Sequence, residues 1–355
     1  MPHHPSPLKL PRLNFGHFPT PLHELARLGE RLGIDLWIKR DDASAGAEAG
    51  NKVRKLEFLL GQAVAERSTA VITCGGLQSN HARATAILAA RLGLSCSLLL
   101  RAEPLEPGQD LARELNRGNA FLARMVGAEV RVLTAAEYQE RDALMNEAAR
   151  ELAARGERPF VIPEGGSNGL GSAGYVEAMR ELRWQIDLGL AGDKRPFDVI
   201  VHACGSGGTA SGVALGAALH GTAHAVHAVA VCNDASYFRA RCEQILAELR
   251  ALLGEHGPHA PLFVDDQAKG PAYGVMSPEQ RAFLVDAART SGLVLDPVYT
   301  GKALFGLAKA VALGTIPRGA RVLFLHTGGL PGLLARPDAL ASELRARRAP
   351  TQGPK

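Results

Sequence analysis

Short apolar segments alternate with longer amphipathic segments along most of this 355-residue chain. Segments 70–74, 198–202 and 321–325 have the length and the apolar composition of buried strands, whereas 80–92 and 235–253 read as helices. Such alternation is typical of α/β proteins, in which helices cover both faces of a mainly parallel sheet. The length exceeds that of one usual hydrophobic core, so we expect two domains, or one large α/β unit with a smaller partner.

The composition excludes several classes of protein. Hydrophobic residues make up 46% and charged residues 21%, and the net charge of +4 is too small to indicate a nucleic-acid or membrane partner. No apolar run approaches the ~20 residues of a membrane helix, and residues 1–19 lack the apolar core of a secretory signal. The five cysteines form no C-x-x-C pair, which favours free thiols in a reducing compartment. We therefore expect a cytoplasmic protein, and no metal site is indicated.

A glycine-rich segment, 204–212, follows one predicted strand and begins a helix. Its glycines allow backbone N–H groups to close around an oxyanion, and the helix N-terminus adds a positive field. It lacks the Lys-Ser/Thr pair of a Walker A loop, and Ala210 replaces the third glycine of the dinucleotide fingerprint. We interpret the segment as a cup for the phosphate of a small cofactor, with a merely tight turn as the alternative. The residues of the cup are Gly205, Ser206, Gly207, Gly208 and Thr209.

Segment 50–58 combines helical spacing with a lysine near its start. Val53 and Leu56 lie on one helix face, and Asn51 can serve as the N-cap, which places Lys52 in the first turn. The helix dipole disfavours a cation there, so the position suits a lysine whose charge is suppressed or replaced by an imine. A solvated surface lysine is the alternative interpretation.

Four consecutive polar side chains, Gln78, Ser79, Asn80 and His81, lie between a predicted strand and a predicted helix. A polar cluster at a helix N-terminus suits a bound carboxylate. Ordinary capping by Ser79 or Asn80 is the alternative, although it explains only one of the four residues.

Three further motifs follow strand-like runs or turns. Thr300 and Thr327, in segments 296–302 and 326–329, can each hydrogen-bond a ring nitrogen without transferring charge, and Tyr273 lies on a glycine-rich turn. Taken singly, each is equally compatible with a plain turn. Ser167 lies in a G-x-S-x-G match of the kind found in α/β-hydrolases, but the sequence contains no accompanying HGGG-type oxyanion segment.

In their order and spacing, these motifs resemble those of the D-cysteine desulfhydrase / 1-aminocyclopropane-1-carboxylate (ACC) deaminase family, from about residue 20 to about residue 334. Members are fold-type II enzymes that use pyridoxal 5'-phosphate and are related to the tryptophan synthase β subunit. The resemblance implies two open, twisted, mostly parallel sheets flanked by helices. We expect a large domain of residues 1–56 and 170–355, a small domain of residues 57–169, and a homodimer.

The resemblance also implies roles for individual residues. Lys52 matches the lysine that holds the cofactor as a Schiff base, and Asn80 matches the asparagine that hydrogen-bonds the ring hydroxyl. Ser79, with Gln78 and His81 nearby, matches the region that binds the substrate carboxylate and transfers protons. Phosphate contacts are implied for Lys55 and the cup, a ring-nitrogen contact for Thr327, and catalytic roles for Tyr273 and Tyr299.

Deaminases of this family carry Glu where Thr300 stands and Leu where Thr327 stands. Threonine hydroxyls cannot keep a ring nitrogen charged, and the weaker electron sink suits loss of a thiolate rather than opening of a cyclopropane. The resemblance therefore favours β-elimination of D-cysteine to pyruvate, hydrogen sulfide and ammonia. ACC deamination and the release of sulfite from cysteate are alternatives within the family, and a serine hydrolase using Ser167 is an alternative of another class.

Overall fold

A computed structural model describes residues 8–102 and 110–345 of the chain. Residues 1–7, 103–109 and 346–355 lie outside the described part. The expectation that residues 1–19 form no secretory signal therefore falls partly outside it.

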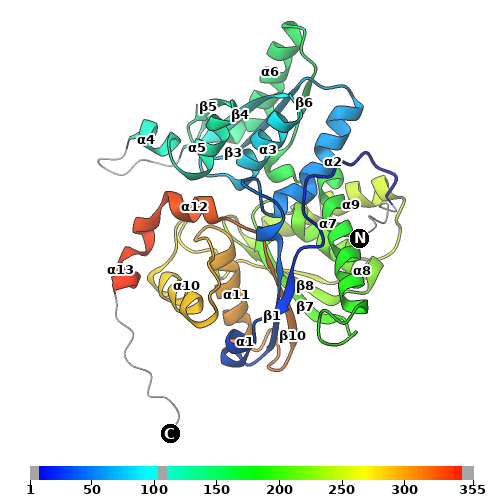
Figure 1. The fold of residues 1–355 in the computed structure, drawn as a ribbon, viewed down its shortest axis with the longest axis vertical. Coiled ribbons are helices and arrows are strands. Elements are labelled where there is room, and N and C mark those ends of the chain that lie inside the picture. Colours follow the sequence, from blue (N-terminus) through cyan, green and yellow to red (C-terminus); the bar gives the residue numbers. More distant parts are fainter. Residues whose placement is uncertain (1–7, 103–109, 346–355) are drawn as a thin grey trace.

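The larger of two sheets has six strands in the order β1-β2-β10-β7-β8-β9. All neighbours pair in parallel except β1, which is antiparallel to β2. This sheet forms the lower part of the molecule in Figure 1. Its strands are β1 (Leu22–Glu24), β2 (Asp35–Arg40), β7 (Phe197–Cys204), β8 (Ala223–Ala230), β9 (Leu262–Asp265) and β10 (Arg321–His326).

The smaller sheet has four strands, all parallel, in the order β5-β4-β3-β6. It lies in the upper part of Figure 1. Its strands are β3 (Ala70–Gly76), β4 (Ser95–Arg101), β5 (Glu129–Leu133) and β6 (Pro159–Val161).

Helices cover both faces of each sheet. The helices of eight or more residues are α2 (Asn51–Ala65), α3 (Asn80–Arg91), α5 (Gly118–Met125), α6 (Arg141–Ala154), α7 (Gly169–Asp187), α8 (Gly208–His220), α9 (Ala235–Leu253), α10 (Pro278–Ser291) and α11 (Thr300–Ala312). Shorter helices are α1 (Ala26–Leu32), α4 (Leu111–Leu115), α12 (Leu330–Ala335) and α13 (Ala341–Arg345), and single 3-10 turns are η1 (Asp41–Ala43), η2 (Glu137–Glu140), η3 (Glu164–Gly166) and η4 (Pro337–Leu340).

The alternation of side chains along β7 shows how the large sheet is covered. Val199 and Val201 pack into the core that α1, α10 and α11 share, whereas Ile200, between them, packs on the opposite face against α7 and α8. A strand buried on both faces is apolar at successive positions, which is why the segment could be recognised from its sequence.

The expected strands and helices are confirmed to within a few residues, including the helix 235–253, which is α9. Elements that were not expected are the strands β1, β2 and β9, the long helix α7, and the shorter helices α1, α4, α5, α12 and α13. Helix α7 begins within a glycine-rich stretch, which we read as a loop. Its glycines instead allow close packing of helices, as at Gly174, which lies against the backbone of α2. One detail was wrong: Asn51 is the first residue of α2 and not its N-cap, which is Gly50, and the Asn51 amide instead donates to the Thr209 hydroxyl at 3.2 Å.

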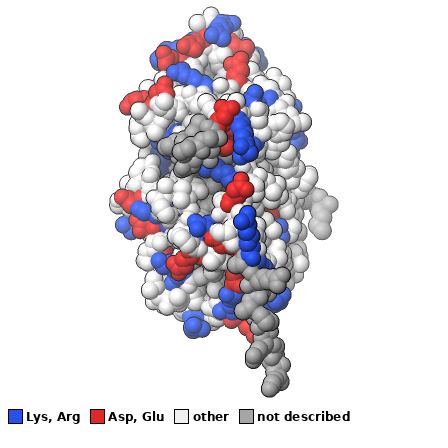
Figure 2. All heavy atoms as spheres, turned by 90° about the vertical axis from the view of Figure 1, so that its left-hand side faces the viewer, with Lys and Arg blue, Asp and Glu red and all other residues white. Residues whose placement is uncertain are grey.

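The division into domains at residues 56 and 170 stays a prediction. All strands of the small sheet lie between these positions, but α2 runs across the first of them. No helix of the described residues is long and apolar enough to cross a membrane. On the face in Figure 2, basic and acidic side chains are interspersed, without an extended region of one sign.

Candidate active site

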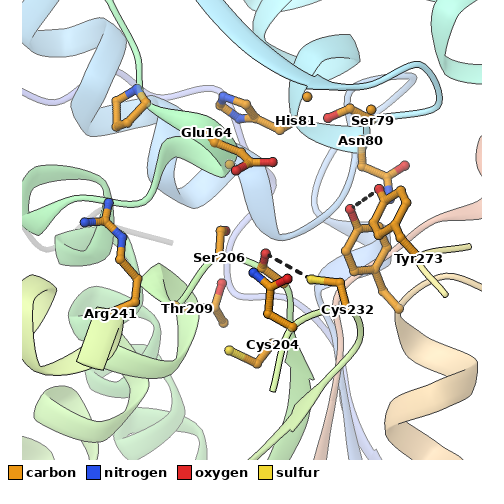
Figure 3. A pocket seen from close by; sticks show the side chains of 18 of the residues that line it. Ser79, Asn80, His81, Glu164, Cys204, Ser206, Thr209, Cys232, Arg241 and Tyr273 are labelled. Carbon is orange, nitrogen blue, oxygen red and sulfur yellow. Dashed lines mark hydrogen bonds between the residues drawn. The ribbon is translucent and has the colours of Figure 1, made fainter. Parts of the chain in front are cut away.

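A cavity of about 580 Å³ lies between the two sheets and is lined from both. Its wall includes the segments that follow β3, β6, β7, β8 and β10, all at the carboxyl ends of the strands. Loops at these ends form the usual ligand site of open parallel sheets, and the volume is typical of small-molecule pockets. In Figure 3, Ser79, His81 and Glu164 lie on one side of the pocket, and Ser206, Thr209 and Cys232 lie on the other.

Lys52 lies in the first turn of α2 and lines the cavity. Gly50, with a φ of +131°, allows the start of this helix to approach the backbone of Thr327, whose carbonyl accepts from the Asn51 N–H at 3.1 Å. Within residues 8–102 and 110–345, no hydrogen bond or ion pair engages the Lys52 amine. Burial lowers the pKa of Lys52 to about 8, although Glu164 acts in the opposite direction. A larger fraction of this amine than of an ordinary lysine is therefore uncharged and nucleophilic near neutral pH.

The predicted phosphate cup forms the turn between β7 and α8. Gly207 has a φ of +84°, and no side chain of the described residues caps α8, so the first N–H groups of this helix remain available to an anion. Ser206 and Thr209 line the cavity together with Gly205 and Gly207. This arrangement fits a phosphate at the N-terminus of α8.

Ser79 is the N-cap of α3, because its oxygen accepts from the Ala82 N–H at 3.2 Å. Among the described residues nothing accepts its own O–H proton, and Ser79 lines the cavity, so the hydroxyl can donate to a bound molecule. Asn80 accepts through Oδ1 from the Asn119 amide at 3.0 Å, which leaves its own amide group to donate. His81 also lines the cavity, and burial lowers its pKa well below the ordinary value, so the ring is neutral.

Four predicted site residues do not line the cavity. Both ends of the Gln78 amide are occupied, since Oε1 accepts from the Asn119 N–H at 2.9 Å and Nε2 donates to the carbonyls of Glu114 and Arg117. The Thr300 hydroxyl donates to the buried carboxylate of Asp296 at 2.7 Å. The other two residues are Lys55, which lies behind the cup, and Gly208, the cup residue that faces the Lys55 amine rather than the cavity.

The two predicted tyrosines lie together in the cavity wall, where Tyr273 and Tyr299 share a hydrogen bond of 2.6 Å between their hydroxyls. Burial raises the pKa of both phenols, so both are protonated at neutral pH. One hydroxyl donates to the other, and the second keeps its proton available for a group in the pocket.

Several lining residues were missed from the sequence. Glu164 accepts from the Tyr138 hydroxyl at 2.7 Å, and Arg241 of α9 donates to the Ser167 carbonyl at 2.8 Å. Glu164 lies just beyond β6, and its place after a strand was the signal that could have found it. Arg241 lies within α9, and its contact with residue 167 depends on the tertiary fold. The other missed residues include Arg101, Arg141, Cys204 and Cys232.

Ser167 does not have the surroundings of a hydrolase nucleophile. The side chain is buried, does not line the cavity, and hydrogen-bonds Lys55 and Ser206 at 2.9 and 2.8 Å. No histidine is among its hydrogen-bond partners in the described part of the chain, whereas a serine nucleophile requires an adjacent base.

A buried lysine of lowered pKa that opens onto a cavity with an anion cup defines a class of site. It suits an enzyme that holds a phosphorylated carbonyl cofactor by its aldehyde and by its phosphate. In the described residues, no group of three or more His, Cys, Asp or Glu side chains is arranged to hold a metal ion.

Comparisons with known proteins agree with this class. The family model for pyridoxal-phosphate dependent enzymes matches residues 13–328. A bifunctional D-cysteine desulfhydrase/1-aminocyclopropane-1-carboxylate deaminase of Arabidopsis thaliana is 41% identical over 96% of this chain and 83% of its own length. A D-cysteine desulfhydrase of Yersinia pestis is 38% identical over 92% of this chain and 96% of its own. The crystal structure of an ACC deaminase homologue superposes with a TM-score of 0.83 at 34% identity, covering 94% of this chain and 97% of that one.

The chain therefore belongs to the pyridoxal-phosphate dependent enzymes, and it has the fold-type II architecture that its sequence led us to expect. Its cofactor is pyridoxal 5'-phosphate.

Proposed function

We propose that this enzyme eliminates sulfide from D-cysteine, with pyruvate and ammonia as the other products, and that Lys52 carries the cofactor. The names of the Arabidopsis and Yersinia relatives support this substrate. The observation that carries the choice is the presence of Thr327 in the cavity wall after β10. Among the described residues, the acidic side chains of the wall, Asp142 and Glu164, come instead from segments that follow strands of the small sheet.

When bound, pyridoxal phosphate supplies the electron sink for the charge that develops at the substrate α-carbon. The hydroxyl of Thr327 offers the ring nitrogen a partner without a full negative charge. This suits a substrate whose β-substituent leaves readily, such as a thiol. The Lys52 amine, released by substrate, has the lowered pKa needed to accept the α-proton near neutral pH.

Other residues of the wall bind and position the substrate. The Ser79 hydroxyl and the Asn80 amide have donors free for a substrate carboxylate and for the cofactor ring hydroxyl, respectively. Gln78 supports this segment from behind, because its amide ties the turn to α5. The Tyr273–Tyr299 pair has one hydroxyl proton that can hydrogen-bond the leaving sulfur and stabilise the charge that develops on it.

The test is a paired assay of sulfide and pyruvate release from D- and L-cysteine, with ACC and cysteate as further substrates. We expect equal amounts of sulfide and pyruvate from D-cysteine at the highest kcat/KM of the four. Higher kcat/KM for ACC or for cysteate would identify the chain with that alternative instead. Labelling of Ser167 by a fluorophosphonate would indicate the hydrolase, and its burial leads us to expect none.

We also propose that the enzyme is a cytoplasmic homodimer. Exposed apolar side chains on two contacting helices, Phe121 and Met125 of α5 and Leu330 and Leu334 of α12, support an interface. The free cysteines support a reducing compartment. Sedimentation analysis of Met125→Glu and Leu334→Glu variants tests the dimer, because a charge at the centre of an interface shifts the protein to monomer.

A further inference from the structure

A line of three polar groups leads from the protein interior to the phosphate cup. The Lys55 side chain is fully buried, and its amine donates to the Ser167 hydroxyl at 2.9 Å and to the Gly165 carbonyl at 3.1 Å. The Ser167 hydroxyl in turn lies 2.8 Å from the hydroxyl of Ser206, which lines the cavity. Lys55 and Ser167 do not line the cavity themselves.

The distances favour one direction of donation along this line. Ser167 accepts from Lys55 and has a single proton to donate. Its two possible acceptors are the Ser206 oxygen at 2.8 Å and the Gly165 carbonyl at 3.4 Å, and the latter already accepts from Lys55. Donation to Ser206 is the better hydrogen bond. The Ser206 proton is then free to point into the cup, where a phosphate, which only accepts, would receive it.

The surroundings of Lys55 explain why an anion is needed nearby. An alanine Cβ at Gly208, in the first turn of α8, would lie 2.7 Å from the Lys55 nitrogen. The amine thus lies at the positive end of a helix dipole, with Lys52 and Arg241 as further cations in its vicinity. Burial, and then the charge of Lys52, lower the pKa of Lys55 well below its ordinary value. A phosphate at the cup would offset this repulsion.

We propose that Ser167 is a positioning residue for the cofactor phosphate, and that Lys55 acts on the phosphate indirectly, through the hydroxyls of Ser167 and Ser206. Gly208 is part of the same arrangement, because a side chain there would displace the Lys55 amine and the Ser167 backbone. This role concerns the binding of the cofactor alone. It therefore does not depend on which amino acid is the substrate.

The test compares the binding of pyridoxal phosphate and of pyridoxal to the cofactor-depleted full-length protein, followed by absorbance. We expect Ser167→Ala to weaken the binding of pyridoxal phosphate about tenfold or more, and that of pyridoxal less than about threefold. Ser172→Ala is the matched control, because Ser172 is an equally buried serine of α7 whose hydroxyl has no hydrogen-bond partner among the described residues. It should leave the binding of both compounds unchanged.

Two outcomes would overturn the proposal. One is unchanged affinity of Ser167→Ala for pyridoxal phosphate. The other is an equal loss for both compounds, which a general packing defect would cause.

A second set of variants tests the indirect action of Lys55 on the phosphate if Ser167→Ala does not fold. In a relay, Lys55→Met and Ser206→Ala remove parts of one chain of hydrogen bonds, so the double variant should lose about as much affinity as the weaker-binding single variant. A direct contact between Lys55 and the phosphate would instead make the two losses multiply. Multiplicative losses would therefore contradict the relay.

Discussion

The hydroxyl oxygens of Tyr273 and Tyr299 lie 2.6 Å apart in the wall of the cavity, although 26 residues separate them in the sequence. Their rings meet edge to face, with centroids 6.0 Å apart. Since burial raises the pKa of both groups, the pair contains two protons and uses only one of them internally. At neutral pH the pair can therefore donate a hydrogen bond to a leaving group, and neither phenol is ionised to act as a base.

Removing either hydroxyl should slow the release of sulfide. We expect Tyr273→Phe and Tyr299→Phe each to reduce kcat for D-cysteine about 100-fold, and the double variant to lose little more, because the two hydroxyls act as a unit. β-Chloro-D-alanine is the control substrate, since chloride leaves without a proton and should be affected far less. Equal losses with both substrates would exclude the role of a leaving-group acid.

The lowered pKa of Lys52 predicts how cofactor attachment depends on pH. Only the uncharged amine attacks the cofactor aldehyde, so the attachment rate should rise with pH and level off above about 8. Stopped-flow absorbance of the cofactor-depleted protein mixed with pyridoxal phosphate measures this rate. A midpoint near 10.5, the ordinary value for lysine, would mean that the Lys52 amine is not desolvated as the structure shows.

The close approach of α7 to α2 predicts a loss of stability at one glycine. An alanine Cβ at Gly174 would lie 2.2 Å from the Arg54 carbonyl oxygen, which is part of the backbone of the Lys52 helix. We expect Gly174→Ala to lower the free energy of unfolding by about 1–3 kcal/mol, as measured by urea denaturation. Gly257→Ala is the control, because no atom of the described residues lies within 4 Å of the added carbon. Equal stability of the two variants would contradict the observed packing.

The position of Thr300 predicts that a single exchange will not create a deaminase. Thr300 is fully buried against the Asp296 carboxylate, so Thr300→Glu would place a second carboxylate beside it. We expect a loss of about 3 kcal/mol or more in unfolding free energy, without gain of ACC turnover. Thr315→Glu, the same change at an exposed position, should be nearly neutral. A stable Thr300→Glu enzyme that deaminates ACC would show that residue 300 reaches the cofactor.

Features that depend on local sequence were predicted best. The place of Lys52 in a first helical turn and the turn of residues 205–209 follow from short-range periodicity and glycine chemistry, and both occur in the structure. The directions in which the polar side chains between a strand and a helix point were harder to predict. Gln78 and Thr300 belong to polar motifs, but each points away from the cavity because a distant or neighbouring partner, Asn119 or Asp296, holds it there.

The contacts of Ser167 could not be read from sequence because they join segments that lie far apart in the chain. Its motif suggested a nucleophile, whereas the structure places it between the buried amine of Lys55 and the cup at Ser206. Likewise, no local pattern distinguishes Arg241 from the other basic residues of α9. Only the packing of that helix against the segment at residue 167 brings it to the cavity.

Reduction of the holoenzyme with borohydride, followed by peptide mass mapping, tests the central assignment most directly. Reduction fixes the cofactor irreversibly to the amine that carries it. The account predicts a single pyridoxyl-phosphate adduct on Lys52, which Lys52→Ala abolishes. An adduct on Lys55 or another lysine, or an unmodified Lys52 in protein that retains its bound cofactor, would contradict it.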